Sequence, residues 1–417
     1  MLSKYKNIYN IESEVINVKL IERPQYLNRL KCLKGTPDIK IITGIRRSGK
    51  SELMKAFAKY VKESNPKVNL IQIDYGDLRY DNLKDYKSLF EYVEKNYKPN
   101  TQNVLMIDEV QLCDRFELAV NSFHNSKKYD IYLTGSNAFL LSSDLSTLFT
   151  GRFIEIPIFP FSFEEYCNYF EIRDNYSNHL EDYLKEGGLA GSYLYNNEED
   201  AVAYIKDIYI SLIKRDLVDR YNIEELALLD TLTEFLMDNI SNFTTANNVA
   251  NILNKDNTKT NHVTIGNYIK YLCNAFMFYK VKRYDIRGKK YLETNDKYYL
   301  SDLSFRYSIL GVRNMDYGRA YENIVAIELL RRGYDIYVGK LYQKEIDFVA
   351  MKASEKIYIQ VSDDISREQT LERVLSPLLF IKDAYSKIIL ANTKHPMTII
   401  EGIKVFDIAR WLLGDEG

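Results

Sequence analysis

The first residues able to do chemistry lie in a short glycine-containing stretch, Gly44-Ile45-Arg46-Arg47-Ser48-Gly49-Lys50-Ser51-Glu52. The spacing G-x-x-x-x-G-K-S is that of a phosphate-binding loop. Its glycines let backbone N–H groups curl around an anion, and a helix beginning near Ser51 points its positive end at the same place. We predict that residues 44–52 bind the phosphates of ATP, with Lys50 at the β- and γ-phosphates and Ser51 on Mg²⁺.

The alternative for this stretch is a glycine-containing turn with an incidental lysine. The flanking sequence disfavours it, because the β-branched run at 39–42 precedes the loop and an amphipathic run, SELMKAFAKYVKES, follows it. A strand, a loop and then a helix form the context that a phosphate loop requires.

An acidic pair follows the apolar run at 104–107, where Asp108 and Glu109 end a predicted strand. In phosphate-loop ATPases such a strand lies near the first one, so Asp108 would hold the Mg²⁺ shell and Glu109 would orient and deprotonate the attacking water. Acidic pairs after strands are common, so this pair alone is weak evidence. Together with the phosphate loop upstream it becomes strong evidence for an ATPase site.

Polar residues also stand where a later strand ends, in KKYDIYLTGSNAFLL. Ser136 and Asn137, close to Thr134, could sense the γ-phosphate or hold the water, while a turn or a helix cap is the alternative. Arg152 precedes a fifth predicted strand within 148–159. We consider it for neutralising charge on the transferring phosphoryl group, in its own site or a neighbour's, against the alternative of a solvated or ion-paired surface arginine.

Composition bounds the class of protein. A chain of 417 residues with 46% hydrophobic and 27% charged residues is expected to form two or three globular domains. The net charge of −2 argues against a protein coated in basic charge for bulk nucleic-acid binding. The four cysteines and four histidines are scattered, which disfavours zinc sites and disulfides. Without a long apolar stretch, we expect a cytoplasmic protein that makes no use of the membrane.

The order of elements divides the chain. Strands and helices alternate through residue 165, which predicts a parallel sheet with crossover helices. Residues 166–230 read as helical, with clustered glycines at 187–191 and a long helix over 201–221, and we interpret them as a lid. Residues 231–312 predict two helices joined by a turn and then a hairpin, the pattern of a winged helix. The hairpin is the most basic stretch of the chain, through Lys280, Lys282, Arg283, Arg287, Lys289 and Lys290. DNA contact and an edge strand protected by lysines both explain these charges.

The last segment, 313–417, holds acidic residues in a nuclease-like order. Glu322, Asp347 and Gln360 follow the layout of a large nuclease fold in which acids bind Mg²⁺ and a lysine positions the water. Ser362 stands at the lysine position and cannot supply a cation. We therefore expect a nuclease-like domain without activity.

Taken together, the stretches ERPQYL, ITGIRRSGKS, VLMIDEVQ, YLTGSN, TGRF, GGLAG, YIKDIYISLIKRD and EIDFVA with IYIQVS resemble the prokaryotic AAA-type ATPases with a C-terminal DUF4143 domain. The resemblance implies an α/β P-loop NTPase core of the AAA/ASCE type with strand order 5-1-4-3-2. It also implies a winged helix and a restriction-endonuclease-like α/β module that is often degenerate. On that match Gly44, Gly49, Lys50 and Ser51 hold phosphates, Asp108 and Glu109 serve metal and water, and Ser136 or Asn137 is the sensor.

Three functions compete. The leading hypothesis is an ATPase using ATP and Mg²⁺, whose hydrolysis switches the winged-helix and nuclease-like domains, with DNA as a candidate partner of the winged helix. The second is an ATP-gated nuclease. The third is a slowly hydrolysing signalling or binding scaffold, in which Arg152 comes from a protein partner or from a second copy of the chain. A small-molecule kinase is the least favoured, because Glu109 beside Asp108 suits water activation.

Overall fold

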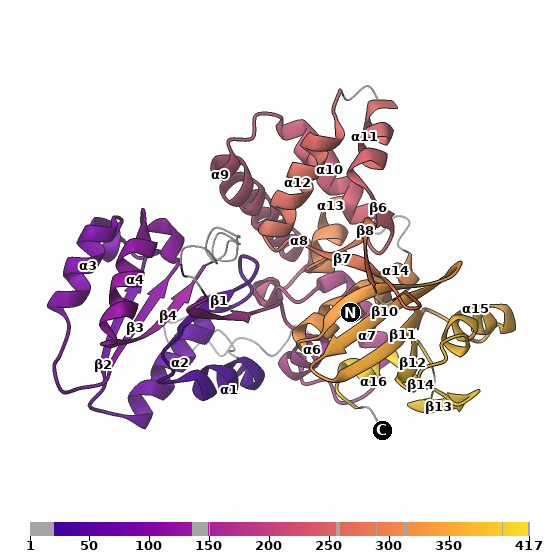
Figure 1. Cartoon of the computed structure of the whole chain (residues 1–417), viewed down its shortest axis with the longest axis horizontal. Helices are drawn as coiled ribbons and strands as arrows, with labels where there is room; N and C mark the ends of the chain where they lie inside the picture. Colours follow the sequence, from indigo (N-terminus) through magenta and orange to yellow (C-terminus); the bar gives the residue numbers. More distant parts are fainter. Residues whose placement is uncertain are drawn as a thin grey trace. The chain divides into compact units, whose positions relative to one another are not determined.

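The computed structural model describes residues 21–135, 149, 151–255, 259–288, 290–311, 316–393 and 395–415. The chain forms two compact units, one with residues 20–159 and 274–276 and the other with 160–273 and 277–417 (Figure 1). The main segment of the first unit ends at Phe159, whereas the sequence predicted a boundary at 165. The predicted boundaries at 230 and 312 fall inside the second unit, and that finer division stays a prediction.

The first unit is built on a five-stranded parallel sheet with the order β2-β3-β4-β1-β5. Its strands are β1 (Ile39–Thr43), β2 (Asn69–Asp74), β3 (Asn103–Asp108), β4 (Tyr129–Thr134) and β5 (Phe153–Pro157). This is the predicted order 5-1-4-3-2 counted from the opposite edge, so that prediction is confirmed. The central strands β1, β3 and β4 are buried along nearly their whole length because helices cover both faces of the sheet.

Each face of this sheet has its own core. Ile42 faces α1 (Pro24–Leu33) and α2 (Lys50–Ser64), where Leu53 and Phe57 pack against it. Ile41 faces the opposite side, which carries α3 (Tyr86–Lys95), α4 (Phe116–Ser126) and the 3₁₀ segments η1 (Leu78–Leu83) and η2 (Val110–Leu112). Alternating side chains of one strand thus hold both layers of helices.

Helices open the second unit. They are α6 (Phe163–Phe170), α7 (Tyr176–Glu186), the 3₁₀ segment η4 (Ala190–Leu194), α8 (Glu198–Ser211), the π-helical segment η5 (Leu212–Val218), α9 (Asp219–Tyr221) and α10 (Leu226–Asp238). The predicted long helix over 201–221 therefore contains a π-helical stretch. The clustered glycines permit close packing, because a Cβ at Gly187 would lie 1.9 Å from Oδ1 of Asp302 and one at Gly188 would lie 2.2 Å from the Phe161 carbonyl oxygen.

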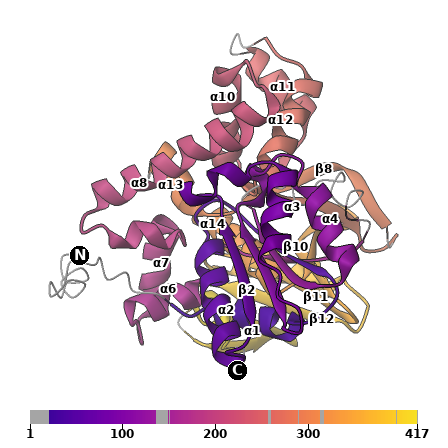
Figure 2. The same ribbon diagram turned by 90° about the vertical axis from the view of Figure 1, so that its left-hand side faces the viewer.

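The segment predicted as a winged helix contains β6 (Phe243–Thr244), α11 (Ala246–Lys255), α12 (His262–Asn274), β7 (Phe278–Asp285) and β8 (Lys290–Leu300). Together with α10, the order is helix, strand, helix, helix, strand, strand, and β8 pairs antiparallel with both β6 and β7. The helices α10, α11 and α12 group together at one end of this unit (Figures 1 and 2).

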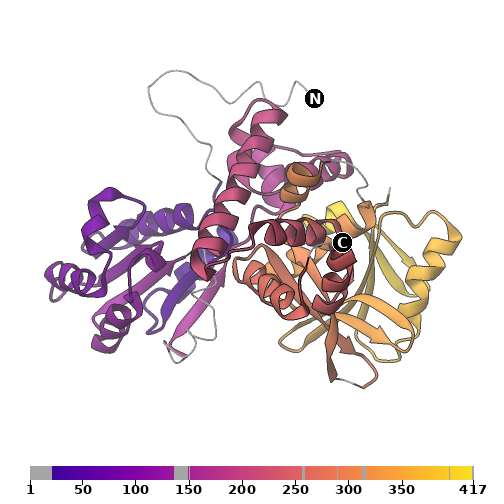
Figure 3. The ribbon, with the colours of Figure 1, turned by 90° about the horizontal axis from the view of Figure 1, so that it is seen from above.

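The remaining elements are α13 (Leu303–Leu310), α14 (Tyr317–Arg331), β9 (Asp335–Leu341), β10 (Lys344–Lys352), β11 (Glu355–Ser362), α15 (Glu368–Leu379), β12 (Ser386–Ala391), β13 (Met397–Ile400), β14 (Ile403–Asp407) and α16 (Ile408–Leu412). Helix α15 packs beside these strands through Val374 and Leu378 (Figure 3). The hairpin strand β7 pairs in parallel with β9, so that β6 to β14 form one nine-stranded sheet, in the order β13-β14-β12-β11-β10-β9-β7-β8-β6. The predicted boundary at 312 therefore falls within a segment that links strands of one continuous sheet.

Candidate nucleotide site

The loop between β1 and α2 has a backbone that only glycine fits at one position. Gly44 has a φ of 140°, and a Cβ there would lie 2.1 Å from the carbonyl oxygen of Ile158. Gly49, directly before α2, has a φ of 96°. Arg47 also adopts a positive φ of 67°. The loop thus doubles back tightly at the carboxyl end of β1 and delivers the chain into the first turn of α2.

Two buried polar side chains lie inside this loop. The Lys50 ammonium donates to the carbonyl oxygens of Gly44 and Ile45, each at 2.9 Å. Ser48 is only 3% exposed, and its hydroxyl has no hydrogen-bond partner in the described part of the chain. A buried hydroxyl of this kind calls for a ligand, and the start of a helix favours an anion. The loop therefore fits the phosphate group that the sequence predicts.

The predicted metal and water residues lie at the end of β3. Asp108 is buried and accepts a hydrogen bond from the hydroxyl of Thr134, at the end of β4. The same Thr134 hydroxyl accepts the backbone N–H of Glu109 at 3.0 Å. Glu109 has a φ of 53°, in the left-handed region, and its carboxylate accepts a hydrogen bond from Gln111. One hydroxyl therefore fixes the carboxylate of Asp108 and the backbone of Glu109.

The loop and these acids lie at the same edge of the sheet. Strands β1, β4 and β3 are neighbours and run parallel, so Gly44, Thr134 and Asp108 all follow or end strands at the carboxyl edge. Ser51 and Glu52 lie in the first turn of α2, next to the loop. The predicted sensors Ser136 and Asn137 lie outside the described residues.

Arg152 lies at the other edge. It precedes β5, and its carbonyl oxygen accepts the N–H of Ile39, the first residue of β1, at 2.9 Å. Since β1 and β5 are parallel, the length of β1, about 16 Å, separates Arg152 from Gly44. The exposed guanidinium instead donates to Asn125 at 2.9 Å. Action of Arg152 on its own site does not fit this geometry, because an arginine side chain does not span that distance, and its role stays a prediction.

Two further residues, which the sequence did not single out, lie beside predicted site residues. Arg23 is buried and donates to the carbonyl oxygens of Ser48 and Phe159, each at 2.9 Å. Asp74 ends β2 directly opposite Asp108 in the strand register. The motif ERPQYL contained the first, but its spacing from the loop gave no chemical signal. Asp74 shows only as an acid after an apolar run, in the pattern that singled out Asp108.

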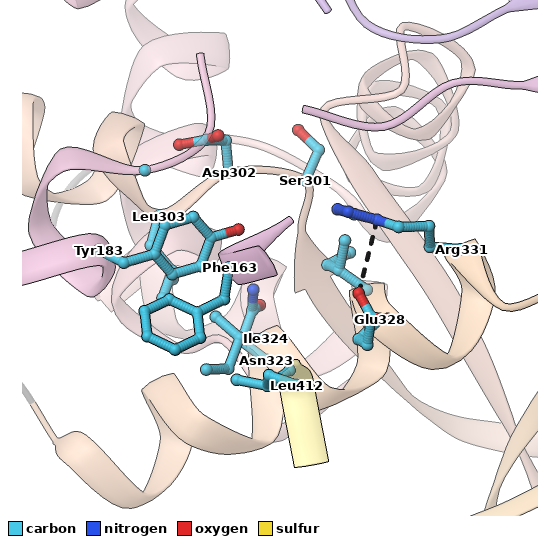
Figure 4. A pocket seen from close by; sticks show the side chains of 12 residues that line it. Phe163, Tyr183, Ser301, Asp302, Leu303, Asn323, Ile324, Glu328, Arg331 and Leu412 are labelled. Atoms are coloured by element: carbon cyan, nitrogen blue, oxygen red, sulfur yellow. Dashed lines mark ion pairs between the residues drawn. The ribbon is translucent and has the colours of Figure 1, made fainter. Parts of the chain in front are cut away.

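A small cavity of the second unit does not qualify as a ligand site. Its volume is about 20 Å³, room for one water molecule. Figure 4 shows Arg331 beside Glu328 in its wall, with 3.5 Å between the paired atoms. Burial raises the pKa of Asp302, and hydrogen bonds from Ser304 and the N–H of Gly188 oppose that change. These polar groups hold the surrounding elements together.

Comparison with known proteins agrees with the geometry of the first unit. Residues 36–167 match a family described as an AAA domain, and residues 177–316 match a domain of unknown function, DUF8612. The C-terminal DUF4143 domain that the sequence resemblance implies is not supported by these matches. The parallel sheet order and the AAA match establish a P-loop fold of the AAA type for the first unit.

Two relatives align over most of their length. An uncharacterized protein of Haemophilus influenzae is 37% identical over 400 residues, which cover 94% of this chain and 99% of that protein. The uncharacterized protein MJ1544 of Methanocaldococcus jannaschii is 27% identical over 385 residues, which cover 88% of this chain and 84% of that protein. Among solved structures, the Aeropyrum pernix ORC1 protein in complex with DNA aligns with a TM-score of 0.32 and 10% identity, covering 75% of this chain and 94% of that one. None of the helices in the described ranges is both long and apolar enough to cross a bilayer.

Proposed function

Because the chain belongs to the same family as the Haemophilus influenzae protein and carries an AAA domain, we propose that it binds ATP with Mg²⁺ at residues 44–52 and hydrolyses it. The observation that carries this proposal is the Thr134 hydroxyl, which fixes Asp108 and Glu109 at the sheet edge that also holds the phosphate loop. Water activation needs such a carboxylate held beside a phosphate site.

Each residue has a distinct task in this proposal. The loop N–H groups and the Ser48 hydroxyl bind phosphate oxygens, and Lys50 exchanges its two carbonyl partners for them. Ser51 and Asp108 would hold Mg²⁺, which neutralises phosphate charge when bound; one or two protein ligands suffice, because Mg²⁺ keeps waters and phosphates in its shell. Glu109 orients a water molecule and accepts its proton.

The first experiment separates binding from turnover. We expect Lys50→Ala to lose both ATP binding and Mg²⁺-dependent hydrolysis, and Glu109→Gln to retain binding but lose hydrolysis. Lys59→Ala is the matched control, since that α2 lysine is 79% exposed and pairs with Glu63, outside the loop. Normal turnover in both purified test variants would show that the site does not hydrolyse ATP.

The position of Arg152 leads to a proposal about assembly. We propose that this exposed arginine, remote from its own phosphate loop, acts in the site of a second copy, where it would neutralise charge on the transferring phosphoryl group. We expect turnover per chain to rise with protein concentration. Arg152→Ala and Lys50→Ala should each be inactive alone, and mixing them should restore part of the activity, because one supplies the loop and the other the arginine.

Arg173→Ala serves as the control, because Arg173 is also exposed and donates to an asparagine. Turnover that is independent of protein concentration, with full activity of Arg152→Ala, would contradict action in a neighbouring site.

Duplex DNA is the proposed partner of the winged-helix segment. Helix α12 exposes His262, Val263, Asn267 and Lys270, and the hairpin exposes Lys282 and Arg287. Part of the predicted basic stretch is used internally, since Lys280 forms an ion pair with Asp296 at 2.7 Å and Arg283 lies over the ring of Phe243. Lys289 lies outside the described residues. The proposal therefore rests on the face of α12 and on a smaller set of hairpin charges than the sequence indicates.

The test is fluorescence anisotropy with labelled duplex DNA over a range of salt concentrations. Lys270→Ala and Arg287→Ala should each weaken binding and reduce its salt dependence, because each removes a phosphate contact. The exposed lysine Lys206, on α8, provides the control variant Lys206→Ala. No binding even at low salt would contradict the proposal.

A further inference from the structure

The nuclease-like residues of the C-terminal segment do come together. Glu322 lies on α14, Asp347 on β10 and Gln360 on β11. The backbone N–H of Asp347 donates to the Gln360 side chain at 2.8 Å, and the Asp347 carboxylate accepts the N–H of Val361 at 2.8 Å. Ser362, at the position where the nuclease fold carries lysine, donates its hydroxyl to the Asp364 carbonyl at 3.0 Å and faces a turn.

A lysine from a different part of the sequence occupies this site. Lys297, on β8 of the hairpin, has a side chain only 5% exposed. Its ammonium lies 2.9 Å from Glu322 and 2.7 Å from Glu345. We call Lys297, Glu322, Glu345 and Asp347 the Lys297 cluster. Its members come from three elements, β8, α14 and β10.

The donors of the Lys297 cluster do not fit the divalent cation that the nuclease fold implies. The Glu322 oxygen that accepts from Lys297 also accepts the Tyr299 hydroxyl at 2.7 Å. No group of three or more histidine, cysteine, aspartate or glutamate side chains within the described ranges is arranged to hold a metal ion. An ammonium between two of the carboxylates would also repel an incoming cation.

The lysine is held in its charged form. Burial alone lowers the pKa of Lys297, but the carboxylates of Glu322, Asp347 and Glu345 outweigh it and raise that pKa. A charged, buried ammonium is stable only while its carboxylate partners stay in place. The Lys297 cluster therefore connects the hairpin to the C-terminal strands by charge, in addition to the pairing of β7 with β9.

We propose that the Lys297 ammonium takes the place of the divalent cation in the C-terminal segment, so that its acidic residues fasten the hairpin to the C-terminal sheet and bind no catalytic metal. This inference is independent of ATP hydrolysis. It gives the acidic residues a structural task and explains why Ser362 is acceptable where a nuclease needs lysine.

The test measures Mn²⁺ binding by electron paramagnetic resonance, in a Lys50→Ala background without nucleotide so that the phosphate loop does not contribute. The parent should show no Mn²⁺ bound at this site at millimolar concentration. Lys297→Met keeps the length of the side chain and frees the carboxylates, so it should bind Mn²⁺ at least about tenfold more tightly than the parent, and adding Asp347→Asn should remove the gain. Lys280→Met is the matched control, because Lys280 also forms a hairpin ion pair, with Asp296, but its side chain is 44% exposed.

A second measurement leaves Lys297 unchanged. The melting temperature of the full chain is followed with Mn²⁺ for the parent and for Asp347→Asn. If Mn²⁺ changes the melting temperature of both proteins equally, the proposal is supported. This comparison serves as the test if Lys297→Met does not fold. A rise with Mn²⁺ in the parent that Asp347→Asn abolishes would overturn the proposal, as would a folded Lys297→Met variant that gains no Mn²⁺ binding.

Discussion

The Thr134 hydroxyl can be tested by a substitution that hardly changes the shape of the side chain. Thr134→Val replaces that hydroxyl by a methyl group. The Asp108 carboxylate loses a hydrogen-bond donor and the Glu109 N–H loses its acceptor. We expect ATP to bind almost as tightly as in the unchanged chain, because the phosphate loop is untouched, and hydrolysis to fall.

The structure gives the size of the effect. Thr134 is fully buried, so water cannot replace the lost bonds at the strand end. A hydrogen bond to a carboxylate contributes about 1.5–3 kcal/mol, and an unpaired buried N–H costs about 1–3 kcal/mol. From the lower ends of these two ranges we expect about 3 kcal/mol of lost stability. Since the Glu109 backbone is held in a left-handed conformation by this bond, a shift of its carboxylate should lower kcat by about 100-fold.

The assay compares Mg²⁺-dependent phosphate release, ATP binding and thermal unfolding. Thr134→Ser keeps the hydroxyl and should retain most activity. Thr233→Val is the matched control for the substitution itself, because Thr233 is equally buried and its hydroxyl donates to a backbone carbonyl in α10. If Thr134→Val kept kcat within twofold while Glu109→Gln abolished turnover, the Thr134 hydroxyl would not position Glu109.

Three further predictions concern the loop and the second unit. Gly44→Ala should abolish ATP binding, measured by calorimetry, because Gly44 has a φ of 140° and the Ile158 carbonyl oxygen leaves no room for a Cβ. Gly35→Ala is the control: Gly35 also has a positive φ, 78°, but open space surrounds it, so this variant should bind ATP normally. Arg23→Lys should weaken ATP binding about tenfold, since the shorter lysine lacks the planar guanidinium fork, whose two ends reach the carbonyls of Ser48 and Phe159. Burial, and next the carboxylates of the Lys297 cluster, raise the pKa of Asp347 to about 7. The folded chain therefore holds a proton that the unfolded chain loses near pH 4, so unfolding free energy should fall by up to about 1.4 kcal/mol per unit as pH rises from about 4 to about 7. In urea unfolding, the free energy of Asp347→Asn should not show this fall with pH. The same pH dependence in Asp347→Asn and the unchanged chain would refute the prediction.

The strand, loop and helix around residues 44–51 could be predicted because the pattern is local. Gly44, Lys50 and Ser51 lie within eight consecutive residues, and their spacing alone carries the prediction of a phosphate site. The strand order came from the family resemblance, and the apolar runs of β1 and β3 located the strands. Asp108 and Glu109 were found for the same reason, since they directly follow such a run.

Residues that act across long stretches of sequence were not predictable. Lys40 reads as a polar position in β1, yet it is fully buried and pairs with Asp130 in β4 at 2.6 Å. Arg23 reaches Phe159 across most of the first unit. Lys297 meets carboxylates from two later elements. Only the folded chain shows these pairs, because a lysine or arginine in sequence carries no sign of the carboxylate or carbonyl that it will meet.

The continuous sheet also limits how hydrolysis could move the second unit. If the winged-helix segment and the C-terminal strands turned against each other, the β7–β9 pairing and the buried Lys297 cluster would both have to break. Moving the ammonium away while its carboxylate partners stay buried would cost about 3–5 kcal/mol, before any lost strand pairing is counted. A movement coupled to ATP would therefore be cheaper if residues 160–273 and 277–417 moved as one body, and the proposed DNA surface of α12 would then move together with the C-terminal strands.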